Sequence, residues 1–336
     1  MIRQNFNADW TVEKGDGNSR MNSFLGNTQT KTVHLPYDAM IHEARTPDTK
    51  NGAQTGFYPG GEYIFQKHFT APQAWQGKPV SLVFEGVYQT ALVYLNGWLL
   101  TRNVNGYAEF TVEAGPYLKY GADNLLKVIA DNSLEPNSRW YTGSGIYRPV
   151  RLLVGNKVYL PQDTVRITTR EADEGFALLD VTAQVQSAST VTERVTLQQT
   201  ICREGTAVLT DRQNLLLQPG ESRTVSFRYC VDSPALWSPE NPNLYTSTMQ
   251  VLEGEEELDR EETGFGIRTL SIDAAHGVRI NGQTVKLRGA CIHHDNGILG
   301  AATLPDAEER RIRQLKEAGF NAIRSSHHPA EIGRAS

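Results

Sequence analysis

The sequence ends in a pattern of strand, helix and strand. Two segments that begin as strands and continue as polar loops, residues 287–295 and 321–329, flank a stretch with helical periodicity. Asp306 at the N-cap position, Glu309 three residues later and Gly319 at the end predict the limits of this helix. Such a connection makes the two strands parallel neighbours in one sheet.

Polar residues follow both predicted strands, which we place at 285–288 and 320–323. Because residues after parallel strands meet at the same edge of a sheet, His293 and the run from Arg324 to His327 should lie together. The alternative is that both histidines are ordinary polar residues near a sheet edge.

Residues 5–155 read as short strands separated by turn residues, with almost no helical periodicity. Apolar or β-branched runs occupy 81–87, 90–95 and 124–130, and Asn96-Gly97 is a strong hairpin signal. So many short strands indicate a β-sandwich or jelly roll.

A second all-β region follows a predicted linker at 156–162. Apolar residues alternate with polar ones over 179–185 and 225–231, which is typical of half-buried strands of an immunoglobulin-like sandwich. The acidic run 253–262 is interpreted as a solvated hairpin tip, and Asn281-Gly282 predicts another hairpin.

Composition limits which partners and which cellular compartment we expect for this chain. The 336 residues carry a formal net charge of −5, without a basic footprint for nucleic acid. Three widely spaced cysteines show no disulfide or metal-binding rhythm, which favours a reducing compartment. The N-terminus lacks the apolar core of a signal peptide, and no stretch approaches the ~20 apolar residues of a membrane span. We therefore expect a cytoplasmic protein with no membrane partner.

The motif Asn321-x-x-Arg324-Ser325-Ser326-His327-x-Pro329 resembles a characteristic stretch of glycoside hydrolase family 2, the family of β-galactosidases, β-glucuronidases and β-mannosidases. His293-His294-Asp295 is similar to the β-galactosidase branch. Further segments that resemble the family are 35–40, 58–63, 138–148, 236–245 and 264–268.

The resemblance implies a mainly β chain with three parts. These are a jelly-roll sugar-binding domain at 1–155, an immunoglobulin-like β-sandwich at 156–270 and the start of a (β/α)₈ barrel, or TIM barrel, at 271–336. A complete barrel takes ~250 residues. We therefore expect this chain to be the N-terminal portion of the enzyme, from a truncated gene product or an expressed fragment.

Glycoside hydrolysis needs two carboxyl groups, which in a retaining enzyme lie about 5 Å apart. The family supplies both as Glu residues on later barrel strands, so we expect no catalytic residue within this chain and no activity from it alone. Glu85 and Glu109 are expected to be exposed and unsuited to act as such a pair.

The resemblance also implies part of a sugar pocket. His293 and His327 would bind sugar hydroxyls, and Arg324 would pair with the nucleophilic carboxylate. Arg139 and Trp140 would reach over the barrel mouth, with the indole as a platform for a sugar face. The alternatives are a structural ion pair for Arg324 and an interdomain packing role for Trp140.

No metal or other cofactor is expected. Some family members have Asp where this chain has Arg139, which argues against a sodium site here. Adjacent side chains in a strand point to opposite faces, so His293 and His294 should not converge on zinc.

The sequence thus predicts an exo-β-glycosidase of the β-galactosidase type, which hydrolyses terminal non-reducing β-galactosides with retention. The alternatives are a β-glucuronidase of the same family and a non-catalytic carbohydrate-binding or assembly module. Expected partners are a β-galactoside or related oligosaccharide and, among proteins, a second copy of the chain or a fragment that completes the barrel.

Overall fold

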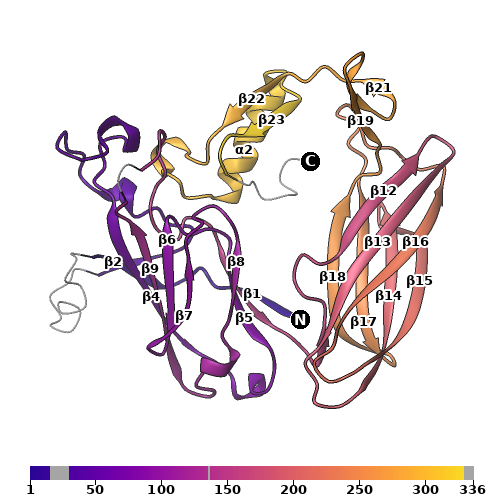
Figure 1. Ribbon diagram of the computed structural model, residues 1–336, viewed down its shortest axis with the longest axis horizontal. Helices are drawn as coiled ribbons and strands as arrows, with labels where there is room; N and C mark the ends of the chain where they lie inside the picture. Colours follow the sequence, from indigo (N-terminus) through magenta and orange to yellow (C-terminus); the bar gives the residue numbers. More distant parts are fainter. Residues whose placement is uncertain (16–29, 135–136, 329–336) are drawn as a thin grey trace.

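The computed structural model describes residues 1–15, 30–134 and 137–328. These residues form a mainly β structure with two β units and a smaller C-terminal unit (Figure 1). The first β unit has its core between Phe6 and Val154, and the second β unit has its core between Val158 and Ile267. The C-terminal unit comprises the elements from Leu270 onward.

Two sheets enclose the core of the first β unit. A four-stranded sheet has the order β1 (Ile2–Asn5), β10 (Val150–Val154), β5 (Val80–Phe84), β8 (Phe110–Glu113). A six-stranded sheet has the order β3 (Lys31–Val33), β2 (Trp10–Lys14), β4 (Gly61–Thr70), β9 (Asp123–Asn132), β6 (Thr90–Leu95), β7 (Trp98–Asn103). Large side chains such as Trp10, Phe65 and Phe84 are fully buried between them. The predicted Asn96-Gly97 hairpin is confirmed, because it joins β6 to β7.

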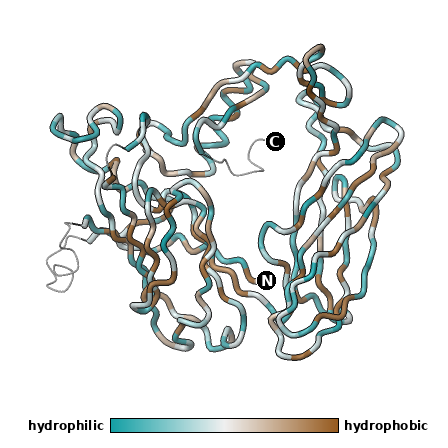
Figure 2. The backbone as a smooth tube through the Cα atoms, in the orientation of Figure 1, coloured by the Kyte–Doolittle hydropathy of each residue, from teal (hydrophilic) through white to brown (hydrophobic). Residues whose placement is uncertain are grey.

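The second β unit is also built from two antiparallel sheets. In one, β13 (Phe176–Ser187) pairs with β11 (Val158–Tyr159), β12 (Arg166–Ala172) and β16 (Ser222–Asp232). The other has the order β15 (Thr206–Leu217), β14 (Glu193–Arg203), β17 (Tyr245–Glu253), β18 (Glu256–Phe265). The predicted alternation is confirmed, since the apolar side chains of β13 and β16 are buried and face the other sheet. Apolar segments run through the strands of both β units in Figure 2.

In the second β unit one local prediction was wrong and another was right only in part. Residues 156–162 are more than a linker, because they contain β11 and bury Val158 and Leu160 in the second core. The acidic run 253–262 contains the predicted hairpin tip, because residues 254–255 join β17 to β18 and are exposed, but the rest of the run is strand from Glu256 onward. Leu258 and Asp259 are both buried in this run, so it is not solvated throughout.

The C-terminal unit contains a small antiparallel sheet, a helix and one parallel strand pair. Its elements are β19 (Leu270–Asp273), β20 (Gly277–Ile280), β21 (Gln283–Thr284), β22 (Gly289–Ile292), α2 (Pro305–Glu317) and β23 (Ala322–Ser325). The predicted parallel pairing is confirmed, because β22 and β23 are parallel with Cys291 opposite Arg324. The Asn281-Gly282 hairpin is confirmed between β20 and β21.

Several boundaries in this unit differ from the prediction. β22 begins only at Gly289, beyond the predicted strand 285–288, and β23 lies two residues later than predicted. Asp306 is not the N-cap, because Pro305 occupies the first helical turn and Leu304 precedes it without a side-chain cap. Gly319 ends the helix as predicted, with φ of +87°.

The helix α2 buries no residue completely among the described part of the chain, although Ile312 and Leu315 are partly covered. Figure 1 shows β22, β23 and α2 lying against one end of the first β unit, whereas β19 and β21 lie above the second β unit. Within residues 1–15, 30–134 and 137–328, no helix has the length and apolar content needed to cross a membrane.

Candidate functional site

The ends of β22 and β23 bring two imidazoles together. His293 follows β22 and His327 follows β23, and their ring centroids are 5.1 Å apart. This confirms the predicted convergence, which parallel pairing makes unavoidable for residues placed just after each strand. His293 is half-buried and His327 is exposed, so the second ring is the more accessible to a ligand.

Trp140 approaches these imidazoles from the first β unit. Its indole stacks on the His327 ring with centroids 3.9 Å apart and an angle of 10° between the planes. Its centroid lies 5.7 Å from that of His293. One indole face is therefore covered by an imidazole, so a ligand could stack only on the opposite face. The packing role and the platform role considered for Trp140 are thus compatible.

Tyr107, which no sequence pattern indicated, holds the edge of the Trp140 indole that carries its N–H group. The Trp140 indole N–H donates to the Tyr107 hydroxyl at 3.0 Å. The backbone carbonyl of Tyr107 accepts from Arg148 at 3.1 Å, and the Tyr107 ring lies 5.1 Å from that of Tyr88. Only tertiary structure brings the loop after β7 to this point, which is why no local pattern in the sequence indicates Tyr107.

His294 and His328 form a second, more deeply buried pair with centroids 5.3 Å apart. The His294 Nε2–H donates to the carbonyl of Thr142 at 2.8 Å, and its ring lies 5.5 Å from that of Tyr147. Burial lowers the pKa of both imidazoles, and the pKa of His328 falls to about 3. Both rings are therefore neutral at pH 7.

The adjacent histidines separate as expected, since His293 contacts Trp140 and His294 contacts Tyr107 and Tyr147. Among residues 1–15, 30–134 and 137–328, no group of three or more His, Cys, Asp or Glu side chains is placed to hold a metal ion.

The loop that carries Trp140 is shaped by two glycines. Gly143 and Gly145 have φ of +65° and +123°, which other residues adopt only with strain. A Cβ atom on Gly145 would lie 2.8 Å from the Phe65 ring, and one on Gly143 would lie 2.5 Å from the Cβ atom of Ala301. The loop therefore approaches both its own core and the C-terminal unit closely.

Arg311 of α2 supports the segment that holds His293. Its guanidinium donates to the carbonyl of His293 at 2.9 Å and to that of Asp295 at 2.6 Å. Because the guanidinium offers several donors in a fixed plane, it sets the direction of the chain immediately after β22.

The two arginines predicted for the site are exposed. Arg324 lies beside Cys291, with 3.5 Å between a guanidinium nitrogen and Sγ, and forms no ion pair with a described carboxylate. Arg139 precedes Trp140 on the same loop and has no hydrogen bond or ion pair to another described residue. The structure thus brings His293, His327 and Trp140 together, whereas Arg139 and Arg324 are exposed to solvent.

The carboxylates of the first β unit lie elsewhere. Glu109 is exposed as predicted, but Glu85 is half-buried, and both pair with Arg151 on the sheet β10-β5-β8. Burial, together with Asp163 and Glu85, raises the pKa of Glu109 to about 7 against the opposing effect of Arg151. Both carboxylates are thus engaged with Arg151.

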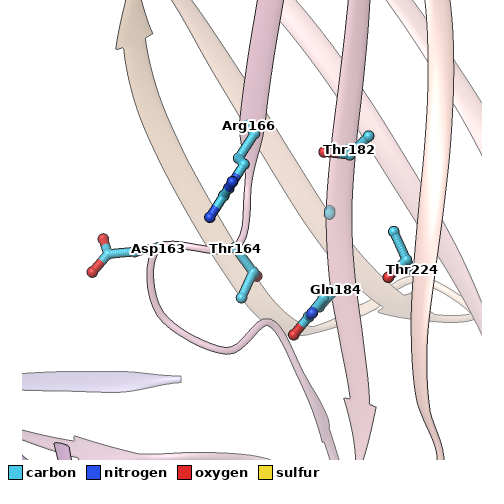
Figure 3. Close-up of a pocket in the computed structure, with 7 residues that line it drawn as sticks. Asp163, Thr164, Arg166, Thr182, Gln184 and Thr224 are labelled. Atoms are coloured by element: carbon cyan, nitrogen blue, oxygen red, sulfur yellow. The ribbon is translucent and has the colours of Figure 1, made fainter.

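A separate pocket of about 330 Å³ lies on the second β unit (Figure 3). Arg166 of β12, Thr182 and Gln184 of β13 and Thr224 of β16 line it together with the loop at Asp163. None of its lining residues is aromatic, so it lacks a surface on which a sugar ring could stack. The cluster formed by Trp140, His293 and His327 therefore remains the candidate site.

Family comparisons match the two β units. Residues 10–176 match the family model described as glycosyl hydrolase 2 galactose-binding domain-like, and residues 158–268 match glycosyl hydrolases family 2. The chain belongs to glycoside hydrolase family 2.

Individual members of family 2 resemble the whole chain. The β-galactosidase BoGH2A of Bacteroides ovatus is 36% identical over 97% of this chain and 38% of its own length. A putative β-glucuronidase of Formosa agariphila is 31% identical over 97% of this chain and 31% of its own length. The crystal structure of a family 2 member from Bacteroides cellulosilyticus has a TM-score of 0.93 and 34% identity, covering 100% of this chain and 44% of that one. The chain thus spans less than half the length of these relatives.

Proposed function

We propose that this chain forms the N-terminal domains and one wall of the substrate pocket of a retaining exo-β-glycosidase of the β-galactosidase type. In this proposal residues 1–155 are a jelly roll, 156–270 an immunoglobulin-like sandwich and 271–336 the opening of a (β/α)₈ barrel. The observation that carries the proposal is the stacking of Trp140 on His327, where a loop of the first β unit meets the ends of two parallel strands.

Each side chain of the cluster suits a part of a sugar. Imidazoles of His293 and His327 exchange hydrogen bonds with hydroxyl groups, and the free face of Trp140 suits the C–H side of a pyranose. The exposed guanidinium of Arg324 is available to hold a carboxylate ionised, and Arg139 lies at the rim.

The reacting carboxyl pair would come from outside the described residues. Retaining hydrolysis uses one carboxyl group to protonate the leaving oxygen and a second, about 5 Å away, to attack the anomeric carbon. No pair of described carboxylates faces the imidazoles, so we expect this chain to need the rest of a barrel for turnover.

A galactoside is the preferred substrate class because the candidate site offers two imidazoles for sugar hydroxyls and an indole for a sugar face. A glucuronide carries a carboxylate at C6, which calls for a cation in addition to Arg324, and the exposed Arg139 is the described candidate for that second cation. The similarity to BoGH2A favours the galactoside, whereas the similarity to the putative β-glucuronidase keeps the second substrate as the alternative.

The competing proposal from another class is a non-catalytic carbohydrate-binding or assembly module. Its support is that each β unit closes its own hydrophobic core without help from the C-terminal unit.

One experiment separates these proposals. The native gene is expressed as a whole, and turnover of nitrophenyl β-galactoside is compared with turnover of the β-glucuronide. Faster cleavage of the galactoside supports our assignment, and faster cleavage of the glucuronide reverses it. A gene product that ends at Ser336 and cleaves neither substrate favours the module.

A further inference from the structure

Asp38 carries a carboxylate that is almost completely buried, with 1% of the residue exposed. It lies just before the short helix η1 (Met40–His42), and the backbone on either side of it pairs with 144–146. A buried charge is costly unless hydrogen bonds satisfy it, so its partners indicate what the residue does.

Four donors from three chain segments satisfy this carboxylate. Its Oδ1 accepts from the backbone N–H of Met40 and of Ser144, each at 3.0 Å. Its Oδ2 accepts from the Tyr141 hydroxyl at 2.6 Å and from the backbone N–H of Ala301 at 2.9 Å. Burial and the Asp38 charge raise the pKa of Tyr141, so the phenol stays protonated and remains a donor.

These hydrogen-bond partners of Asp38 come from the two chain segments that form the candidate site. Tyr141 and Ser144 belong to the loop that carries Trp140, whereas Ala301 belongs to the segment between β22 and α2, just after His293 and His294. The loop and the segment meet in only two further hydrogen bonds among the described residues, from His294 to the Thr142 carbonyl and from the Thr303 N–H to the Tyr147 carbonyl.

Two glycines make room for the carboxylate between the two sides. A Cβ atom on Gly300 would lie 2.2 Å from Oδ2 of Asp38, and one on Gly143 would lie 2.7 Å from the same atom. Both glycines have positive φ, so the backbone on each side is shaped around this one oxygen.

We propose that Asp38 is a positioning residue that holds Trp140 against His293 and His327 by tying the loop at 141–144 to the segment at Ala301. Its link to sugar hydrolysis rests on the function proposed above, but its effect on the position of Trp140 does not. Asp38 itself touches no group of the cluster; it acts through Tyr141, Ser144 and Ala301.

Two variants break the link from opposite sides. In Asp38→Asn, either orientation of the amide turns its NH₂ group toward two donors, so two of the four hydrogen bonds are lost. Gly300→Ala leaves Asp38 and the first core unchanged but drives a Cβ atom into Oδ2. Gly297→Ala is the matched control, because it has φ of +54° in the same segment and nothing within 4 Å of the added Cβ.

The test uses the 336-residue chain and two readouts of the cluster. The first is the NMR signal of the Trp140 indole N–H, assigned with Trp140→Phe. The second is hydrogen exchange of peptides that cover 141–147 and 293–303. In Asp38→Asn and Gly300→Ala we expect the indole signal to shift and exchange in both peptides to rise about tenfold or more, as for the loss of hydrogen bonds to a charged group. Gly297→Ala should change neither readout.

An unchanged indole signal in folded Gly300→Ala would overturn the proposal, even if Asp38→Asn proves too unstable to measure. An equally large shift of the indole signal in Gly297→Ala would also overturn the proposal. Any strain in the segment would then be enough to move Trp140, with no role for the contact to Asp38. In the product of the native gene, both variants should raise KM for a β-galactoside about tenfold with a smaller change in kcat. Shifted signals in a protein that cleaves no galactoside would leave Asp38 as the positioning residue and refute only the proposed function.

Discussion

The indole of Trp140 lies flat on the imidazole of His327, with 3.9 Å between the ring centroids. The two residues come from different units of the chain, and the contact depends on the hydrogen bond from the indole N–H to Tyr107. The site is therefore assembled by packing between units as well as by the strands that carry its histidines.

Tyr107→Phe should loosen this stack while leaving the phenyl ring in place. The variant removes the acceptor of the Trp140 indole N–H, so we expect the indole NMR signal to shift and the free energy of unfolding to fall by about 1 kcal/mol. Tyr120→Phe is the control, because its hydroxyl donates to the Gly115 carbonyl at 2.9 Å far from the cluster. Equal indole shifts in both variants would contradict the role given to Tyr107.

Acid should destabilise the protein through His328. Burial and the neighbouring positive or ionisable groups lower the pKa of this imidazole to about 3 in the folded state, against 6.5 in an unfolded chain. Between these values the unfolded state binds more protons, so stability is complete above about pH 6.5 and is lost as the pH falls toward 3. Urea unfolding at pH 7 and pH 4 should show a smaller loss for His328→Asn than for the unmodified protein. Identical losses would mean that other groups cause the acid sensitivity.

Glu109 should act in the opposite direction. Its pKa of about 7 in the folded state exceeds the 4.5 of an unfolded chain, so the folded state holds the proton more tightly. The associated stability is present below about pH 4.5 and is lost as the pH rises through 7. The stability of Glu109→Gln relative to the unmodified protein should therefore increase from pH 5 to pH 8 in urea unfolding. A stability difference that stays constant from pH 5 to pH 8 would contradict the role given to Glu109.

The first β unit alone, residues 1–155, should bind galactose weakly. Its loop at 139–141 supplies one wall of the pocket, whereas a sugar must be held on several sides to offset its lost freedom and displaced water. Titration calorimetry should give a dissociation constant above roughly 1 mM. Much tighter binding would favour the independent binding module.

Hydrogen exchange should become faster beyond Ser271. The strand β19 is almost wholly exposed and α2 has no buried residue, in contrast to the alternately buried strands β13 and β16. Peptides from 271–292 and 305–317 should therefore exchange sooner than those of the second β unit. The segment 293–303 should be the exception, because it is bound to the first β unit. Uniform protection from 271 to 328 would refute this expectation.

Local patterns predicted the elements better than their limits. The alternation in β13 and β16 and the two Asn-Gly hairpins were recognised because a single chain segment contains the whole signal. Asp306 was mistaken for an N-cap because Pro305, which fits the first helical turn, stands just before it. Pro329 and the tail at 330–336 lie outside the described residues.

The convergence of His293 with His327 was predictable because parallel pairing alone imposes it. The contact of Trp140 with these rings came only from the family resemblance, and Tyr107 and Asp38 were missed. Asp38 accepts a hydrogen bond from Ala301, which lies 263 positions away in the sequence. No pattern in the residues around either position indicates this contact. Such buried hydrogen bonds depend on how whole units pack, which no local periodicity encodes.

The carbonyl of Thr142 and the ring of His294 meet although they are 152 positions apart. The tryptophan-bearing loop and the imidazoles therefore belong to separate parts of the sequence, the loop to the first β unit and the imidazoles to the ends of β22 and β23. Recombination that exchanges 137–148 between relatives would present a new surface to the same histidines, provided that Gly143 and Gly145 are retained. Ligand preference in this architecture can thus change while the fold that supports it is retained.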